Sequence, residues 1–180
     1  MSVEARPYLV MRSPERWLAV LRITVGVWFL KALWTKLTIT LAWGVLPVPT
    51  ASDRWIQAMP TLLARYADGN PLGFFREFLQ HTVIPNPAVF AHLTAFGEVA
   101  VGLGLTFGFL TSLAAAIGLV LVMNYGLATQ WMTPNQQGFH LLLAVCMVAF
   151  LAARAGRQWG LDGWLHVNRP ASFWARLPLG

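Results

Sequence analysis

The chain has 180 residues, of which 57% are hydrophobic and only 11% are charged, and its formal net charge is +6. Soluble domains carry roughly 25% charged residues, so this composition excludes an ordinary soluble protein and predicts a single membrane domain over residues 1–180. The basic residues lie mainly towards the two ends of the chain and not on one face among aromatic residues, which excludes nucleic acid as a partner and favours the lipid bilayer.

Four apolar stretches are long enough to form transmembrane helices, because one crossing needs about 20 residues. We expect these helices at 17–38, 89–109, 112–130 and 139–155. The run from Val99 to Gln130 contains no charged residue and is too long for one crossing, so a tight turn around Gly108 should divide it into a helical hairpin. The expected fold class is therefore all-α, a polytopic bundle of four transmembrane helices.

The connection between the first two helices, residues 39–88, contains amphipathic segments. Ser52 or Asp53 can cap a helix that runs to Ala67, and Pro60 would kink this helix or make it start later. A second segment, with phenylalanines on one face, follows it. Amphipathic helices between two spans lie on the membrane surface or cover the end of a bundle.

Lysine and arginine residues near the helix ends predict the orientation. They comprise Arg6, Arg12 and Arg16 before the first helix, and Arg154, Arg157, Arg169 and Arg176 after the fourth. Because positive loops stay in the cytoplasm, we expect a multi-pass protein of the inner (cytoplasmic) membrane with both termini in the cytoplasm. The 39–88 connection then faces the opposite, extracytoplasmic side.

Ionisable residues within the spans are the candidate functional residues, since such groups are rare at membrane depth. Glu98 lies roughly 13 Å below the outer end of the second helix, at 1.5 Å of rise per residue. Lys31 and Lys36 of the first helix reach the same half of the bilayer, and either of them could pair with Glu98. The same half contains His92, Asn124, Tyr125 and His140.

Other features indicate packing. Arg22 and Asp162 are expected to form a structural ion pair on the inner side, and Gly104-x-x-x-Gly108 is a small-residue motif for close helix contact. His92 and His140 begin spans at the interface without a second histidine pair, so neither a haem nor a metal site is expected.

Three segments resemble the DoxX/DoxD family. They are LRITVGVWFLKALWTKL, AFGEVAVGLGLTFGFLTSLAAAIGLVLVMNYGLA and RAGRQWGLDGWL. The resemblance extends over about residues 17–166 and implies a four-helix membrane protein linked to quinone redox chemistry, as in the membrane subunit of thiosulfate:quinone oxidoreductase. The residues that match the family's motifs are Arg22, Lys36, Glu98, Asn124 and Asp162. Lys31 does not belong to these motifs.

With this resemblance, the residues predict a subunit of a quinone-linked oxidoreductase, an electron-transfer complex with quinone as cofactor and other membrane subunits as partners. Glu98 would relay the quinol proton, and Lys31 or Lys36 would hold its charge; these are the candidate catalytic residues. The candidate quinone-binding residues are Asn124, Tyr125, His92 and His140. The competing hypothesis is a non-catalytic structural subunit of a larger respiratory or photosynthetic membrane complex, in which the polar cluster only fixes helix register.

Overall fold

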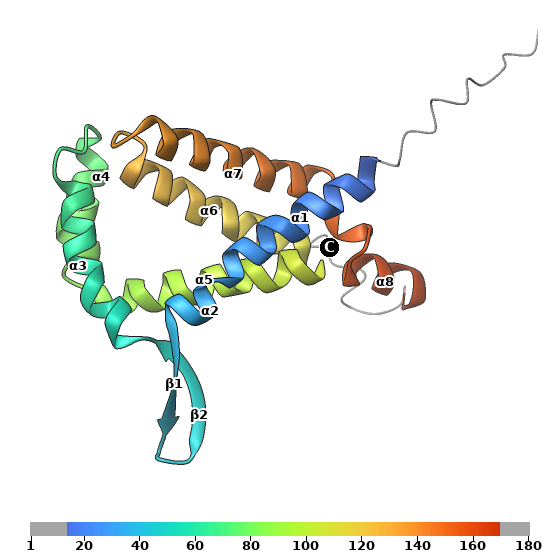
Figure 1. The fold of residues 1–180 in the computed structure, drawn as a ribbon, viewed down its shortest axis with the longest axis horizontal. Helices are drawn as coiled ribbons and strands as arrows, with labels where there is room; N and C mark the ends of the chain where they lie inside the picture. Colours follow the sequence, from blue (N-terminus) through green and yellow to red (C-terminus); the bar gives the residue numbers. More distant parts are fainter. Residues whose placement is uncertain (1–13, 170–180) are drawn as a thin grey trace, which may run out of the picture.

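The computed structural model describes residues 14–169 and shows a bundle of long helices (Figure 1). Helix α1 (Pro14–Leu30) continues past Lys31 into the short α2 (Ala32–Thr35), and the bundle is completed by α5 (Pro87–Phe107), α6 (Thr111–Thr129) and α7 (Pro134–Ala152). Over the described residues, four helices are long and apolar enough to cross a membrane. The expected four-helix bundle is confirmed, while Arg6, Arg12 and Arg176, which the orientation prediction used, lie outside the described residues.

Local signals place the helix ends close to the expected positions. Pro87 and Pro134 stand in the first turns of α5 and α7, where a missing N–H leaves no helical hydrogen bond unmade. Gly108 ends α5 with a left-handed backbone, φ 64°, and α6 begins at Thr111, so the predicted tight turn is present. The first helix ends at Thr35, earlier than expected, because the chain enters a β-strand at Leu37.

The connection between the first two spans forms helices that lie across one end of the bundle (Figure 1). Helix α3 (Asp53–Ala67) starts where Ser52 accepts a hydrogen bond from Trp55 N at 3.3 Å, and it continues through Pro60. Helix α4 (Gly73–Phe78) and the π-helical turn η2 (Leu79–Val83) follow. Phe75, Leu79 and Val83 pack with Ala67 and Ala128, so this layer covers the ends of α5 and α6.

A two-stranded hairpin precedes α3 and was not expected from the sequence. Strands β1 (Leu37–Ala42) and β2 (Leu46–Ala51) pair antiparallel, with Leu37 opposite Ala51. The run Leu-Thr-Ile-Thr-Leu alternates in strand fashion, and prolines at 47 and 49 exclude a helix in the second arm. These signals were available in the sequence, but the helical reading of 39–88 passed over them.

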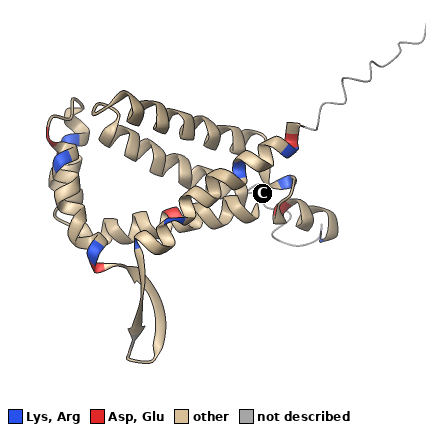
Figure 2. Ribbon diagram, in the orientation of Figure 1, with Lys and Arg blue, Asp and Glu red and all other residues tan. Residues whose placement is uncertain are grey.

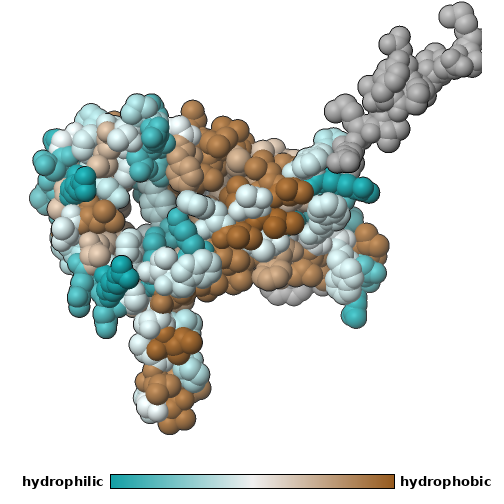
Figure 3. Space-filling view, viewed as in Figure 1, coloured by the Kyte–Doolittle hydropathy of each residue, from teal (hydrophilic) through white to brown (hydrophobic). Residues whose placement is uncertain are grey.

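The opposite end of the bundle is closed by the segment after α7. It contains a 3₁₀ turn, η3 (Ala155–Arg157), and the short helix α8 (Leu161–Asn168). Most charged residues lie towards the two ends of the molecule, a few lie along the first span and α5, and α6 and α7 contain none (Figure 2). Between the ends, apolar side chains cover the surface of the bundle in the face shown in Figure 3. This distribution is the one that a bilayer requires.

Close approach of α1 and α5 depends on glycine. A Cβ added at Gly26 would lie 2.5 Å from Thr106 N, and one added at Gly102 would lie 2.8 Å from Leu30 N. Next to this contact, Val25 and Phe29 pack on Val101 and Leu105 in the main core. Small residues let transmembrane backbones approach closely, and dispersion contacts then stabilise the pair. The sequence predicted a packing role for Gly26 as well as for Gly104 and Gly108. A Cβ at Gly104 would meet Ala114 of α6 at 2.5 Å, so that glycine serves the α5–α6 contact.

Replacing Gly26 with alanine should lower the stability of the bundle by about 1–3 kcal/mol, because the new methyl group would overlap the backbone at Thr106. The measurement is the thermal unfolding midpoint in detergent. The matched control is Gly138→Ala in α7, where a Cβ meets nothing within 4 Å and alanine is the better helix former. Equal midpoints for the two variants would contradict the close contact of α1 with α5.

Candidate functional site

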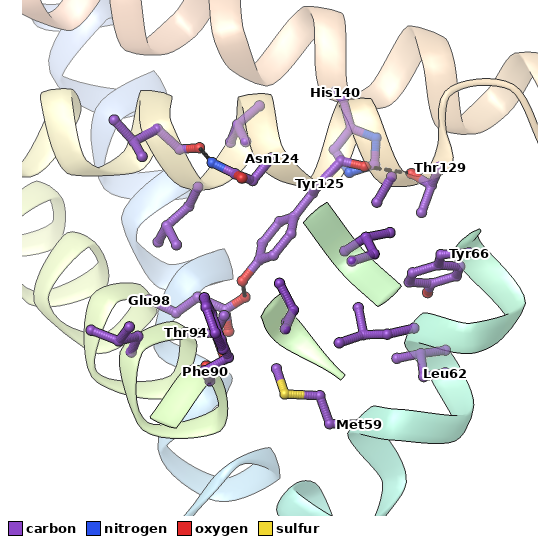
Figure 4. A pocket seen from close by; sticks show the side chains of 18 of the residues that line it. Met59, Leu62, Tyr66, Phe90, Thr94, Glu98, Asn124, Tyr125, Thr129 and His140 are labelled. Atoms are coloured by element: carbon purple, nitrogen blue, oxygen red, sulfur yellow. Dashed lines mark hydrogen bonds between the residues drawn. The ribbon is translucent and has the colours of Figure 1, made fainter. Parts of the chain in front are cut away.

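A cavity of about 520 Å³ lies at the end of the bundle that α3 covers (Figure 4). Its walls come from the first span, from α3, α4 and η2, and from α5, α6 and α7. Met59 and Leu62 of α3 face Phe90 and Tyr125 across it. The volume falls within the range of small-molecule sites, roughly 300–1,000 Å³, and the mostly apolar walls with a few polar groups are typical of them.

Three polar side chains meet in the wall of this cavity. Lys36 Nζ donates to Glu98 Oε1 at 2.8 Å, and Tyr125 OH donates to the same oxygen at 2.8 Å (Figure 4 shows Tyr125 directed at Glu98). Glu98 is only 6% exposed, and the Lys36 side chain is 16% exposed. The ammonium of Lys36 also lies over the ring of Trp55, 4.3 Å from its centroid. The carboxylate is therefore paired and hydrogen-bonded, as a charge at this depth requires.

Two polar atoms of the cavity-lining residues are buried without a hydrogen-bond partner. They are Glu98 Oε2, an acceptor, and Trp55 Nε1, a donor. Leaving such a group unsatisfied costs about 1–3 kcal/mol. Lys36 contacts both residues, since its Nζ lies 2.8 Å from Glu98 Oε1 and 4.3 Å from the centroid of the Trp55 ring. Both residues line the cavity, and satisfying the two atoms requires an acceptor for Trp55 Nε1 and a donor for Glu98 Oε2.

The structure pairs Glu98 with Lys36 and not with Lys31, a choice that the sequence left open. The helix is interrupted at Lys31, and its Nζ lies over the ring of Trp28, 3.7 Å from the centroid. Lys36 follows the last turn of α2, where its carbonyl accepts from Ser52 N at 2.8 Å. The base of the β-hairpin thus fixes the backbone from which Lys36 reaches Glu98.

The other candidate residues divide into those near the cavity and one away from it. Asn124 lines it, but its Nδ2 donates to Val120 O at 2.8 Å within α6. His140 also lines it, with its ring against that of Tyr125. His92 is outside the lining; its Nδ1 lies 2.7 Å from Ala88 O and its ring stacks on Phe96. Among residues 14–169 there is no group of three or more His, Cys, Asp or Glu that could hold a metal ion.

Sequence reasoning missed the contribution of α3. Trp55, Met59 and Tyr66 form one wall of the cavity, although the pattern suggested only a helix on the membrane surface or over the bundle. Burial raises the pKa of the Tyr66 phenol above its ordinary value, and the neighbouring Arg65 opposes part of the rise, so this hydroxyl is protonated at neutral pH. The helical spacing of these residues was the available signal, but it could not show which partner their apolar face meets.

No salt bridge joins Arg22 and Asp162 among the described residues, because backbone groups bind each side chain, although the buried Nε of Arg22 has no hydrogen-bond partner. Arg22 is fully buried and donates to the carbonyl oxygens of Leu105 (2.5 Å), Gln158 (3.3 Å) and Trp159 (3.1 Å). Asp162 accepts from the backbone N–H groups of Leu110 (2.8 Å) and Thr111 (2.9 Å) at the start of α6. Within the described residues the one salt bridge is Lys36–Glu98. Both residues fasten the chain after α7 to the bundle: Arg22 links it to α1 and α5, and Asp162 links it to the α5–α6 turn.

Replacing Lys36 with methionine should destabilise the bundle by about 3 kcal/mol, because it leaves the buried Glu98 carboxylate without its cation. Lys31→Met is the matched control and should cost less than about 1 kcal/mol, since it removes only a cation–π contact. Chemical unfolding in detergent micelles measures both. A larger loss for Lys31→Met than for Lys36→Met would show that the wrong lysine has been assigned to Glu98.

Comparison with known proteins identifies the family. The family model described as "TQO small subunit DoxD" matches residues 17–172. This range is most of the chain, which therefore belongs to the DoxD family. The match confirms the resemblance that the first, second and third spans and the C-terminal segment carry. No curated protein and no solved structure matches the chain.

Proposed function

We propose that this DoxD-family chain is the membrane subunit of a quinone-linked oxidoreductase and that the cavity beneath α3 binds the quinone head. The description of the family names a subunit of TQO, thiosulfate:quinone oxidoreductase, which supports a role in a larger complex. The observation that carries the proposal is the pair of unpartnered atoms, Glu98 Oε2 and Trp55 Nε1, at one apolar cavity. Other membrane subunits would supply the electrons.

The residues of the cavity fit a quinone by their chemistry. The Trp55 N–H can donate to a ring carbonyl, and the free oxygen of Glu98 can accept from a ring hydroxyl. The apolar side chains of α3, α5 and α6 match the ring and the start of an isoprenoid tail. A bound quinone supplies a couple that takes up two electrons and two protons.

The chain's own residues would manage one proton and exclude water. Glu98 exchanges the proton at Oε2, while Lys36 and Tyr125 hold Oε1 and keep the carboxylate in place. Tyr125, predicted from the sequence as a quinone-binding residue, here positions the carboxylate, and the Nδ2 of Asn124, another predicted quinone-binding residue, donates to Val120 O within its own helix. Helix α3 covers the cavity and separates the polar cluster from the membrane surface. In this proposal the chain sits in the inner membrane with both termini in the cytoplasm, so the site lies in the outer half of the bilayer.

Purification of the chain from its native membrane in mild detergent should yield about one quinone per chain by chromatographic analysis of the extract. Glu98→Gln and Trp55→Phe should each lower retention of the quinone about tenfold, since each removes one hydrogen-bonding group worth about 1.5 kcal/mol when a charged or buried partner is involved. Trp34→Phe is the control, because Trp34 is 71% exposed and is not part of the cavity wall.

The same purification tests the competing hypothesis of a structural subunit. Stable association with large partner subunits, no quinone bound to this chain and unchanged quinone-dependent turnover in Glu98→Gln would overturn the proposed site. Assembly of each variant, measured as partner subunits recovered per chain, separates loss of binding from loss of the complex.

A further inference from the structure

The β-hairpin leaves the bundle as an arm without any charged residue. Residues 37–52 contain no Asp, Glu, Lys or Arg, and the arm points away from the helices, across their direction (Figure 1). Its apolar side chains are open to the surroundings, with Ile39 72%, Val45 78% and Trp43 90% exposed. In the space-filling view the outer part of the arm is apolar (Figure 3). A hairpin in water would show a polar face instead.

The depth at which the arm leaves the bundle places it beside lipid. Its last residue, Ala51, is buried in a cluster with Met59 and with Ala91, which is in the second turn of α5. At 1.5 Å per residue, Ala91 lies about 6 Å inside the end of this membrane span. The arm therefore departs sideways below the helix ends, at the boundary between headgroups and hydrocarbon.

The backbones of the two strands pair with each other, and two threonine hydroxyls find partners within the arm, as an apolar environment favours. The hydroxyl of Thr40 contacts the hydroxyl of Thr50 and the carbonyl of Val48, each at 3.4 Å. Pro47 and Pro49 carry no N–H, so strand β2 presents fewer unpaired donors. One face is wholly apolar: it holds Leu37 opposite Ala51, Ile39 opposite Pro49 and Leu41 opposite Pro47.

The tip of the arm contains a tryptophan in a costly conformation. Trp43 has a left-handed backbone, φ 53°, beside Gly44 at φ 75°. Bulky residues avoid this conformation, which asparagine and glycine adopt readily in hairpin turns. A tryptophan here gains nothing from the protein's own core, since it is 90% exposed. Tryptophan is the residue that membrane proteins place at the level of the headgroups.

We propose that the β1–β2 hairpin is an interfacial membrane anchor, which lies in the lipid leaflet around the α3 end of the bundle with Trp43 at the headgroup–hydrocarbon boundary. The exposed apolar side chains of the hairpin contact phospholipid. Lys36 directly precedes strand β1, and its carbonyl accepts from Ser52 N at the base of the hairpin, so the anchor fixes the depth of the polar cluster relative to the bilayer. This inference does not depend on what the cavity binds.

Site-directed spin labelling tests the anchor on the full-length chain in liposomes of phosphatidylcholine and phosphatidylglycerol. The background is Cys146→Ala, which removes the native thiol, and the label is attached to Trp43→Cys. Collision with dissolved oxygen, which concentrates in lipid, is compared with collision with a water-soluble nickel chelate. Val145→Cys on the exposed face of α7 provides the lipid reference, and Glu77→Cys on α4 provides the water reference.

The label at position 43 should favour oxygen over the chelate several-fold more than the label at 77, with a depth between the two references. A ratio equal to that at position 77 would overturn the proposal, since the arm would then be in water. An immobilised label that neither reagent reaches would also overturn it, because a second copy or another protein would then cover the tip. Val45→Cys repeats the measurement if Trp43→Cys does not assemble.

Discussion

A carboxylate inside an apolar bundle has to be paired, because an unpaired charge at that depth costs several kcal/mol. For Glu98 this requirement is met by Lys36 and Tyr125, which approach the same oxygen from the first span and from α6. The pairing restricts the surrounding structure. The first helix has to end beside α5, the hairpin has to begin at Leu37, and α6 has to present Tyr125 towards α5. The cavity lies between the first span, α5, α6 and α7 on one side and the layer of α3, α4 and η2 on the other.

The two ends of the bundle meet the same requirement in different ways. At the α8 end, backbone carbonyl and N–H groups bind Arg22 and Asp162, and the result is a fastening of the last segment to the α5–α6 turn. At the α3 end, side chains pair with one oxygen of Glu98, a residue of the cavity wall, and leave its other oxygen without a hydrogen-bond partner. A purely structural ion pair gains nothing from an adjacent cavity of this size, and for this reason the functional proposal rests on the α3 end.

The connection between the first two spans contains helix α3 and the β-hairpin, the two features that distinguish this bundle. Helix α3 covers the cavity and contributes Trp55 to it, while the hairpin extends into the surroundings of the bundle. Both start from the short stretch between Lys36 and Ser52, where a backbone hydrogen bond closes the base of the hairpin. The hydrogen bond between Ser52 N and Lys36 O therefore links the position of Lys36, a candidate catalytic residue, to the position of helix α3.

The sequence by itself determined the four spans, the turn at Gly108 and the helix from Asp53 to Ala67, because hydropathy over about 20 residues, glycine at a helix end and a serine cap are local signals. It also pointed to Glu98 as the buried acid, since charge is rare in such a chain. Only the tertiary structure decided that Lys36 and not Lys31 pairs with Glu98, that Trp55 joins the cavity, and that Arg22 and Asp162 bind backbone groups. Each of these depends on the rotation and depth of one helix against another, and a helix broken at Lys31 no longer follows the regular 3.6-residue geometry from which such contacts are predicted.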